Sequence, residues 1–92
     1  MINHVLLVGK IHELKVIDKK YRLYIEVKRN YKNIEGIYEN DIFECRVWTA
    51  IGLKLFNNYN DGDLVSLKGR LGENEGKCFV CVEQIILLNK NR

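Results

Sequence analysis

Residues 42–71 read IFECRVWTAIGLKLFNNYNDGDLVSLKGRL, and this stretch decides the fold. Its beginning, residues 42–49, alternates between a polar and an apolar face, which predicts a strand. Residues 50–60 then carry apolar side chains at helical spacing, although Gly52 weakens the helix. After a turn, residues 64–71 return to the pattern of a strand. The stretch therefore predicts a strand, one short amphipathic helix and a second strand.

Three further strands are predicted around this stretch. The first, residues 3–17, is apolar on both faces at its start and bends at Gly9. The second, residues 21–29, alternates cleanly, so one face packs into a core and the other meets water or a ligand. The last strand covers residues 77–88. Polar connections are expected at a turn 18–20, a loop 30–40, a turn 60–63, a hairpin connection 72–76 and a frayed end 89–92.

Five strands with a helix between the third and the fourth follow the order of the OB-fold barrel, so we expect an all-β fold with one short helix. Residues 1–92 are expected to form a single domain, because no linker or repeat is visible and a second domain has no room. No apolar run approaches ~18 residues, and the first ten residues lack the basic start of a signal peptide. We therefore expect a cytoplasmic protein without a membrane segment.

Basic residues gather in one part of the chain. The formal net charge is +3, whereas residues 10–32 hold eight lysines and arginines against three acidic side chains. A concentrated basic face suits a polyanion. From charge alone, a solvated surface of mixed charge is the alternative.

Cys78 and Cys81 have the C-x-x-C spacing of some metal and redox sites. Their neighbours read as a strand, in which positions three apart point to opposite faces, and the sequence offers no second pair of ligands. We therefore expect no metal, no dithiol chemistry and no cofactor. The cysteines are better interpreted as small apolar strand residues in a reducing compartment.

Four pieces of the chain, in order, resemble the strands of the bacterial single-stranded-DNA-binding (SSB) family. They are residues 2–11 (INHVLLVGKI), the alternating stretch from Leu23 to Tyr31, residues 41–48 (DIFECRVW) and residues 61–71 (DGDLVSLKGRL). The resemblance covers nearly the whole chain. It implies an OB-fold that binds single-stranded DNA without sequence preference, in replication, recombination or repair of a host or mobile element.

The chain departs from that family in three places. The hairpin connection at residues 72–76 is short and has no aromatic, and Ile42 stands where the family usually has one. The family's flexible linker and acidic C-terminal peptide are absent from the sequence, which fits either a tailless relative or a trimmed chain. We therefore expect weaker binding per subunit than is usual in the family.

The resemblance points to Tyr31 and Trp48 as platforms on which bases stack, with Tyr24 and Tyr38 as further candidates. For Trp48 the alternative is partial burial under the helix. The basic residues expected to contact the DNA backbone are Lys10, Arg22, Lys28, Arg29, Lys32 and Arg46. The alternative for these side chains is an ordinary solvated surface.

The apolar first strand also predicts a subunit interface. Strand pairing there would resemble the family's dimer contact and lead to a homotetramer or a homodimer. The residues expected at the interface are Asn3, His4, Val5, Leu6, Leu7 and Val8. Single-stranded DNA, other copies of the chain and replication proteins are the expected partners.

The residues also bear on two other functions. A primosome-like OB adaptor that mainly docks proteins is the alternative to DNA binding, and the short hairpin and the absent tail favour it. An enzyme is not expected, because no nucleophile–base pair, carboxylate cluster or phosphate-cradling glycine loop is visible.

Overall fold

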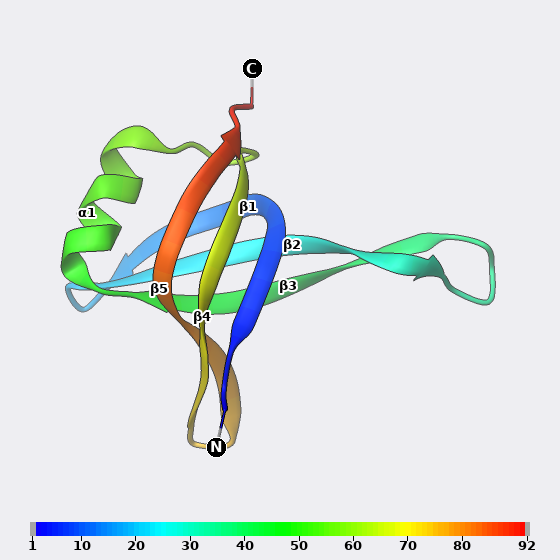
Figure 1. Cartoon of the computed structure of the whole chain (residues 1–92), viewed down its shortest axis with the longest axis horizontal. Coiled ribbons are helices and arrows are strands. Elements are labelled where there is room, and N and C mark those ends of the chain that lie inside the picture. Colours follow the sequence, from blue (N-terminus) through cyan, green and yellow to red (C-terminus); the bar gives the residue numbers. More distant parts are fainter. Residues whose placement is uncertain (1, 92) are drawn as a thin grey trace.

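The computed structural model describes residues 2–91, in which five strands close into one barrel in the order β1-β2-β3-β5-β4 (Figure 1). Its elements are β1 (Val5–Ile17), β2 (Lys20–Lys32), β3 (Tyr38–Val47), α1 (Thr49–Asn58), β4 (Leu64–Asn74) and β5 (Lys77–Asn89). β1 pairs with β4 through its first half and with β2 through its second, while β3 and β5 make a short parallel contact. This arrangement confirms the predicted OB-fold order with its single helix.

The barrel interior is built from alternate residues of the strands. Leu23 and Ile25 of β2 are fully buried, and their neighbours on the opposite face are not. Cys45 of β3 and Leu55 of α1 meet them in the same core cluster. Burying one such leucine or isoleucine side chain stabilises the fold by roughly 1.5–3 kcal/mol. The alternation predicted for residues 21–29 is therefore the feature that turns β2 toward the core.

The glycine in α1 is required by close packing. A Cβ at Gly52 would overlap the ring of Tyr21 on β2. The helix follows Trp48, whose side chain makes no capping hydrogen bond. Tertiary contact with β2 thus outweighs the low helix propensity of glycine.

The polar loop expected at residues 30–40 is mostly strand. β2 continues to Lys32 and β3 begins at Tyr38, so the two strands form an arm that extends from the barrel (Figure 1). At its tip the side chain of Asn33 accepts the backbone N–H groups of Glu35 and Ile37, at 2.9 and 3.0 Å. The prediction was wrong because an exposed hairpin needs only backbone pairing and a capped turn, not apolar alternation. We call residues 28–40 the β2–β3 arm.

Two other hairpins turn within two residues. Asp18 and Lys19 have φ values of 50° and 63°, and Glu75 and Gly76 have φ values of 52° and 77°. Positive φ at both positions is the geometry of a type I′ turn, which matches the twist of paired strands. The connection predicted at residues 72–76 is therefore shorter still, because β4 runs on to Asn74.

The polar end of the chain is held, not frayed, up to residue 91. The backbone N–H of Asn91 donates to Oδ1 of Asp63 at 2.7 Å, and Nζ of Lys90 donates to the carbonyl of Asn58 at 2.7 Å. Asp63 has no exposed surface and also accepts the N–H of Asn60 at 2.9 Å. The prediction was wrong here because a buried carboxylate recruits the strand end; Arg92 lies outside the described residues.

The first strand is buried on one face only. Val5 and Leu7 pack against the core, whereas Leu6 and Val8 are 72% and 51% exposed. β1 begins at Val5, two residues later than predicted, because the side chain of Asn3 instead makes two 2.9 Å hydrogen bonds with the backbone of Leu71. No helix in residues 2–91 is long and apolar enough to cross a membrane.

Candidate nucleic-acid interface

The outward face of β2 and β3 carries charges of both signs. Across the two strands, Arg22 lies opposite Arg46, Tyr24 opposite Glu44, Glu26 opposite Ile42 and Lys28 opposite Asn40. These residues point away from the core because Leu23 and Ile25 point into it. Cations therefore stand at the two ends of this face, and the two glutamates lie between them.

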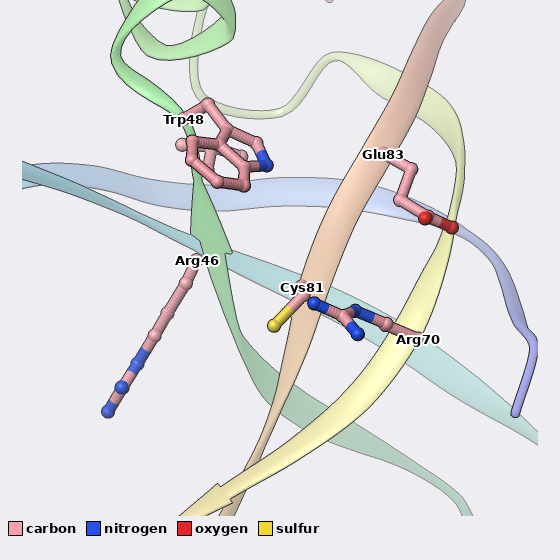
Figure 2. A pocket seen from close by; sticks show the side chains of 6 residues that line it. Arg46, Trp48, Arg70, Cys81 and Glu83 are labelled. Carbon is pink, nitrogen blue, oxygen red and sulfur yellow. The ribbon is translucent and has the colours of Figure 1, made fainter.

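The first end of the face opens into a pocket of about 280 Å³, which we call the Trp48 pocket (Figure 2). Trp48 is 73% exposed, so it is not buried under α1. Arg46 on β3 and Arg70 on β4 lie at the same pocket. The full lining is Arg46, Val47, Trp48, Arg70, Cys81 and Glu83.

Arg46 is held over an aromatic ring. Its Cζ lies 3.6 Å from the ring centroid of Phe79, and that ring rests against Gly72, where a Cβ would crowd it. Glu44 is the nearest carboxylate, 3.7 Å from Nε of Arg46, and that Nε has no hydrogen-bond partner among the described residues. Nε is itself buried, but stacking fixes the guanidinium plane and 30% of the Arg46 side chain stays exposed to an anion.

The second end of the face holds a groove of about 400 Å³, which we call the Tyr38 groove. Nζ of Lys28 and Nζ of Lys32 lie 4.6 and 5.6 Å from the centre of the Tyr38 ring, which is 44% exposed. Lys10 of β1 also lines the groove. The full lining is Val8, Gly9, Lys10, Glu26, Lys28, Tyr38, Asn40 and Leu64.

Arg29, predicted as a backbone contact, is bound by two carboxylates instead. It donates to both oxygens of Asp41, at 3.0 and 2.9 Å, and to Glu39 at 3.0 Å. These contacts raise the pKa of Arg29, chiefly through the hydrogen bond with Asp41, and lower the pKa of Asp41. Glu39 and Asp41 alternate with Tyr38 and Asn40 along β3, so the Arg29 cluster lies on the opposite face of the arm.

The two remaining aromatics that were predicted to stack on bases, Tyr31 and Tyr24, lie outside the Trp48 pocket and the Tyr38 groove. Tyr31 is 62% exposed and belongs to β2, not to the loop in which it was expected. Tyr24 is half-buried, with Nζ of Lys15 at 5.4 Å from the centre of its ring. The structure does not bring Tyr31 or Tyr24 into either pocket.

Comparison with known proteins finds relatives of similar sequence. No family model matches the chain. Single-stranded DNA-binding protein 1 of Streptococcus pyogenes is 30% identical over 79 residues, which is 77% of this chain and 59% of that protein. Its namesake from Streptococcus agalactiae is 34% identical over 77 residues, which is 77% of this chain and 47% of that protein. The chain thus spans about half the length of these relatives.

Solved structures share the fold. Mitochondrial single-stranded DNA binding protein Rim1 of S. cerevisiae has a TM-score of 0.77 at 16% identity, covering 99% of this chain and all of the other. A small single-stranded DNA binding protein from Mycoplasma pneumoniae has a TM-score of 0.74 at 20% identity, covering 94% and 93%. The chain is a short, SSB-like OB-fold protein.

Two residues at this end of the face are not among the contacts predicted from the sequence: Arg70, which lines the Trp48 pocket, and Phe79, whose ring lies against Arg46. Both face outward because Arg70 pairs with Cys81 and Gly72 pairs with Phe79. The spacing of two residues between Phe79 and Cys81 was a usable signal, but the register shift after Lys68 hid which strand faces matched.

The cysteines of this SSB-like protein lie in three settings. Cys45 is buried, and its burial raises the pKa of the thiol to about 12, so it stays protonated. Cys78 is exposed and Cys81 lines the Trp48 pocket. Within residues 2–91 no three His, Cys, Asp or Glu side chains are grouped to hold a metal ion.

Proposed function

We propose that this chain binds single-stranded DNA without sequence preference and that the Trp48 pocket is its main contact. The observation that carries the proposal is a 73% exposed tryptophan at a pocket flanked by two arginines, Arg46 and Arg70. An indole accepts any base because every base has a π-face, and guanidinium groups suit phosphates. The names of the relatives, all single-stranded DNA-binding proteins, support the same function.

The other predicted contacts take secondary roles in this proposal. Arg22 lies opposite Arg46, so it extends the cationic end of the β2–β3 face. Tyr31, Tyr24 and Lys32 stay candidate contacts outside the two pockets. Arg29 is withdrawn as a backbone contact, because its donors are already bound by Asp41 and Glu39. We further propose a non-catalytic role in DNA replication, recombination or repair, as binding proteins of this kind would serve.

The proposal is tested by replacing Trp48. Trp48→Ala should weaken binding of labelled oligo-dT, followed by fluorescence anisotropy, by about 5- to 150-fold, since one stacked base is worth roughly 1–3 kcal/mol. Phe56→Ala is the matched control, because Phe56 is also an exposed aromatic, at 58%, but lies on α1. In the wild type, oligo-dT should quench the fluorescence of Trp48, the only tryptophan of the sequence. Equal affinities of both variants would refute the stacking role.

We also propose that the chain self-associates through the outer face of β1, β4 and β5. Four apolar side chains are at least half exposed there: Leu6, Val8, Ile86 and Leu88. Val8 and Ile86 lie on either side of Ser66, because Val8 pairs with Ser66 and Ser66 with Ile86. In addition, β1 pairs with β2 only from Lys10 onward, so its edge before that residue is available to a second copy.

Light scattering tests the self-association. The wild type should have the mass of a dimer or a tetramer, and Leu6→Lys should shift it toward the monomer. Leu53→Lys, which places the same charge on an exposed apolar residue of α1, should leave the mass unchanged. A wild type that is monomeric at high concentration would contradict the proposal.

A role as a protein-docking adaptor has one observation in its favour. Leu53 and Phe56 are 49% and 58% exposed and lie three residues apart on α1, so they form an apolar stripe. The oligo-dT titration separates the two functions. Quenching of Trp48 at moderate salt supports DNA binding, and an unchanged signal at all salt concentrations favours the adaptor.

A further inference from the structure

The Tyr38 groove offers the same two kinds of chemical group as the Trp48 pocket, namely cations and an aromatic ring. Lys10 of β1 and Lys28 of β2 bring two ammonium groups, and Tyr38 of β3 brings an aromatic ring with 44% of its surface exposed. Asn40 adds an amide that can hydrogen-bond a base edge or a phosphate. Cations with an aromatic face are what single-stranded nucleic acid requires of a binding site.

The groove and the pocket share one face but lie far apart on it. Asn40 lines the groove, Arg46 lines the pocket, and both point outward from β3 six residues apart. At about 3.3 Å per strand residue, this separation is roughly 20 Å. At the stacked rise of about 3.4 Å per nucleotide, one strand needs about six nucleotides to reach from one to the other, and fewer when extended.

The surface between them does not favour phosphates. Glu44 and Glu26 lie there, paired across the strands with Tyr24 and Ile42, and Glu26 also lines the near side of the Tyr38 groove. Glu44 lies 3.7 Å from Nε of Arg46, and Glu26 lies 3.7 Å from Nδ1 of His12, so neither carboxylate is matched by a close bidentate partner. A DNA backbone would be attracted at both ends of the face and repelled in the middle.

We propose that the Tyr38 groove is a second, separate subsite for the same strand of DNA, with a phosphate held by Lys10 and Lys28 and a base stacked on Tyr38. The proposal rests on the proposed function of the Trp48 pocket and adds a bipartite mode of binding. A strand long enough to reach both subsites gains the second contact at high effective concentration. A shorter strand gains only one contact.

Oligo-dT of three and ten nucleotides distinguishes these cases. The wild type should bind the ten-nucleotide oligomer at least tenfold more tightly than the three-nucleotide oligomer, with both quenching Trp48. In Lys10→Gln/Lys28→Gln, the affinity for the longer oligomer should fall toward that of the shorter one. The slope of log K against log salt should also fall by about 0.7, because the one phosphate contact that is lost on a single strand removes about 0.7.

Two further variants complete the test. Tyr38→Leu should lower the affinity for the ten-nucleotide oligomer without changing the salt slope, because it removes stacking and no charge. Lys54→Gln/Lys77→Gln is the matched control, since it removes the same charge from α1 and from the start of β5. All of these variants leave Val8 in place, because Val8 also belongs to the apolar face proposed for self-association.

The outcomes separate the two proposals. If the ten-nucleotide oligomer quenches Trp48 but the Lys10/Lys28 double variant behaves like the Lys54/Lys77 control, the second subsite is refuted and the Trp48 pocket stands. Equal wild-type affinities for both oligomers would refute it in the same way. If neither oligomer binds or quenches Trp48, the proposed function itself fails.

Discussion

Replacing Asp63 with alanine should destabilise the fold while leaving the β2–β3 face untouched. The carboxylate has no exposed surface and accepts the backbone N–H groups of Asn60 and Asn91, at 2.9 and 2.7 Å. Leaving one buried N–H without a partner costs about 1–3 kcal/mol, so two would cost about 2–6 kcal/mol. Asn60 and Asn91 are exposed residues, and water can reach their N–H groups once the side chain is gone. We therefore expect a loss of about 2–3 kcal/mol.

The effect of Asp63 should depend on pH with a defined sign. The N–H groups of Asn91 and Asn60 hold the pKa of Asp63 below its ordinary value. Because the folded-state pKa is lower than the unfolded one, the ionised carboxylate stabilises the fold fully above an unfolded pKa of about 3.9. This contribution is lost as the pH falls through the folded-state pKa. The difference between wild type and Asp63→Ala should thus be largest near neutral pH and shrink in acid.

Urea unfolding at constant protein concentration measures this difference, with the midpoint moving and the m-value unchanged. Asp61→Ala is the matched control, because Asp61 is exposed and two residues away, and it should change stability by less than about 0.5 kcal/mol. Hydrogen exchange at the amides of Asn60 and Asn91 should accelerate in Asp63→Ala alone. Equal stabilities of the two variants at pH 7 would show that Asp63 does not hold the end of the chain.

Three further substitutions follow from the contacts. Gly52→Ala should lower the free energy of unfolding by about 1–3 kcal/mol in urea, because its Cβ would overlap Tyr21; a stabilisation, as helix propensity alone predicts, would contradict the packing argument. Glu44→Gln should raise the affinity for oligo-dT at low salt, and the gain should shrink as salt screens the charge; a loss of affinity would count against repulsion at the centre of the face. Asp41→Asn should speed hydrogen exchange in the β2–β3 arm without moving the unfolding midpoint, and unchanged arm amides would show that the Arg29–Asp41 pair does not hold it.

The barrel could be predicted because its core residues form a local, alternating sequence pattern. Leu23 and Ile25 alternate with polar residues, and this alternation alone turns one face of β2 inward. The strand, helix and strand of residues 42–71 follow from changes of period that need no knowledge of distant partners. Turn residues supplied the remaining boundaries to within a few positions.

The β2–β3 arm could not be predicted from the same signals. Its residues do not enter the core, so no apolar period marks it as strand. It is held by contacts across the hairpin, such as Asn33 at the tip and the Arg29–Asp41 ion pair, and these depend on register. The alternation of β2 did contain one usable signal: it placed Arg29 and Lys28 on opposite faces, which disfavours contact of both side chains with the same ligand.

The residues of the candidate site also fall into two groups: some are predicted by a local sequence pattern, and the others depend on how distant strands pair. Trp48 and Arg46 were found because they belong to one strand motif, whereas Arg70 and Phe79 come from strands whose outward faces are set by the β4–β5 register. The same distinction applies to Arg29. Its charge was visible in the sequence, but its carboxylate partners, Glu39 and Asp41, lie across the hairpin.

The ion pairs of Arg29 also bear on the proposed binding of DNA through the arm. Uncompensated, Glu39 and Asp41 would leave two negative charges beside the phosphates that Lys28 is proposed to hold. By binding both carboxylates, Arg29 lowers the negative potential of the arm and keeps its strands paired. We therefore infer that Arg29 supports the arm that carries Tyr38 and Lys28 from the opposite face. This arrangement concentrates the attractive contacts at the two ends of the β2–β3 face, so the affinity should depend on strand length more than on the net charge of the chain.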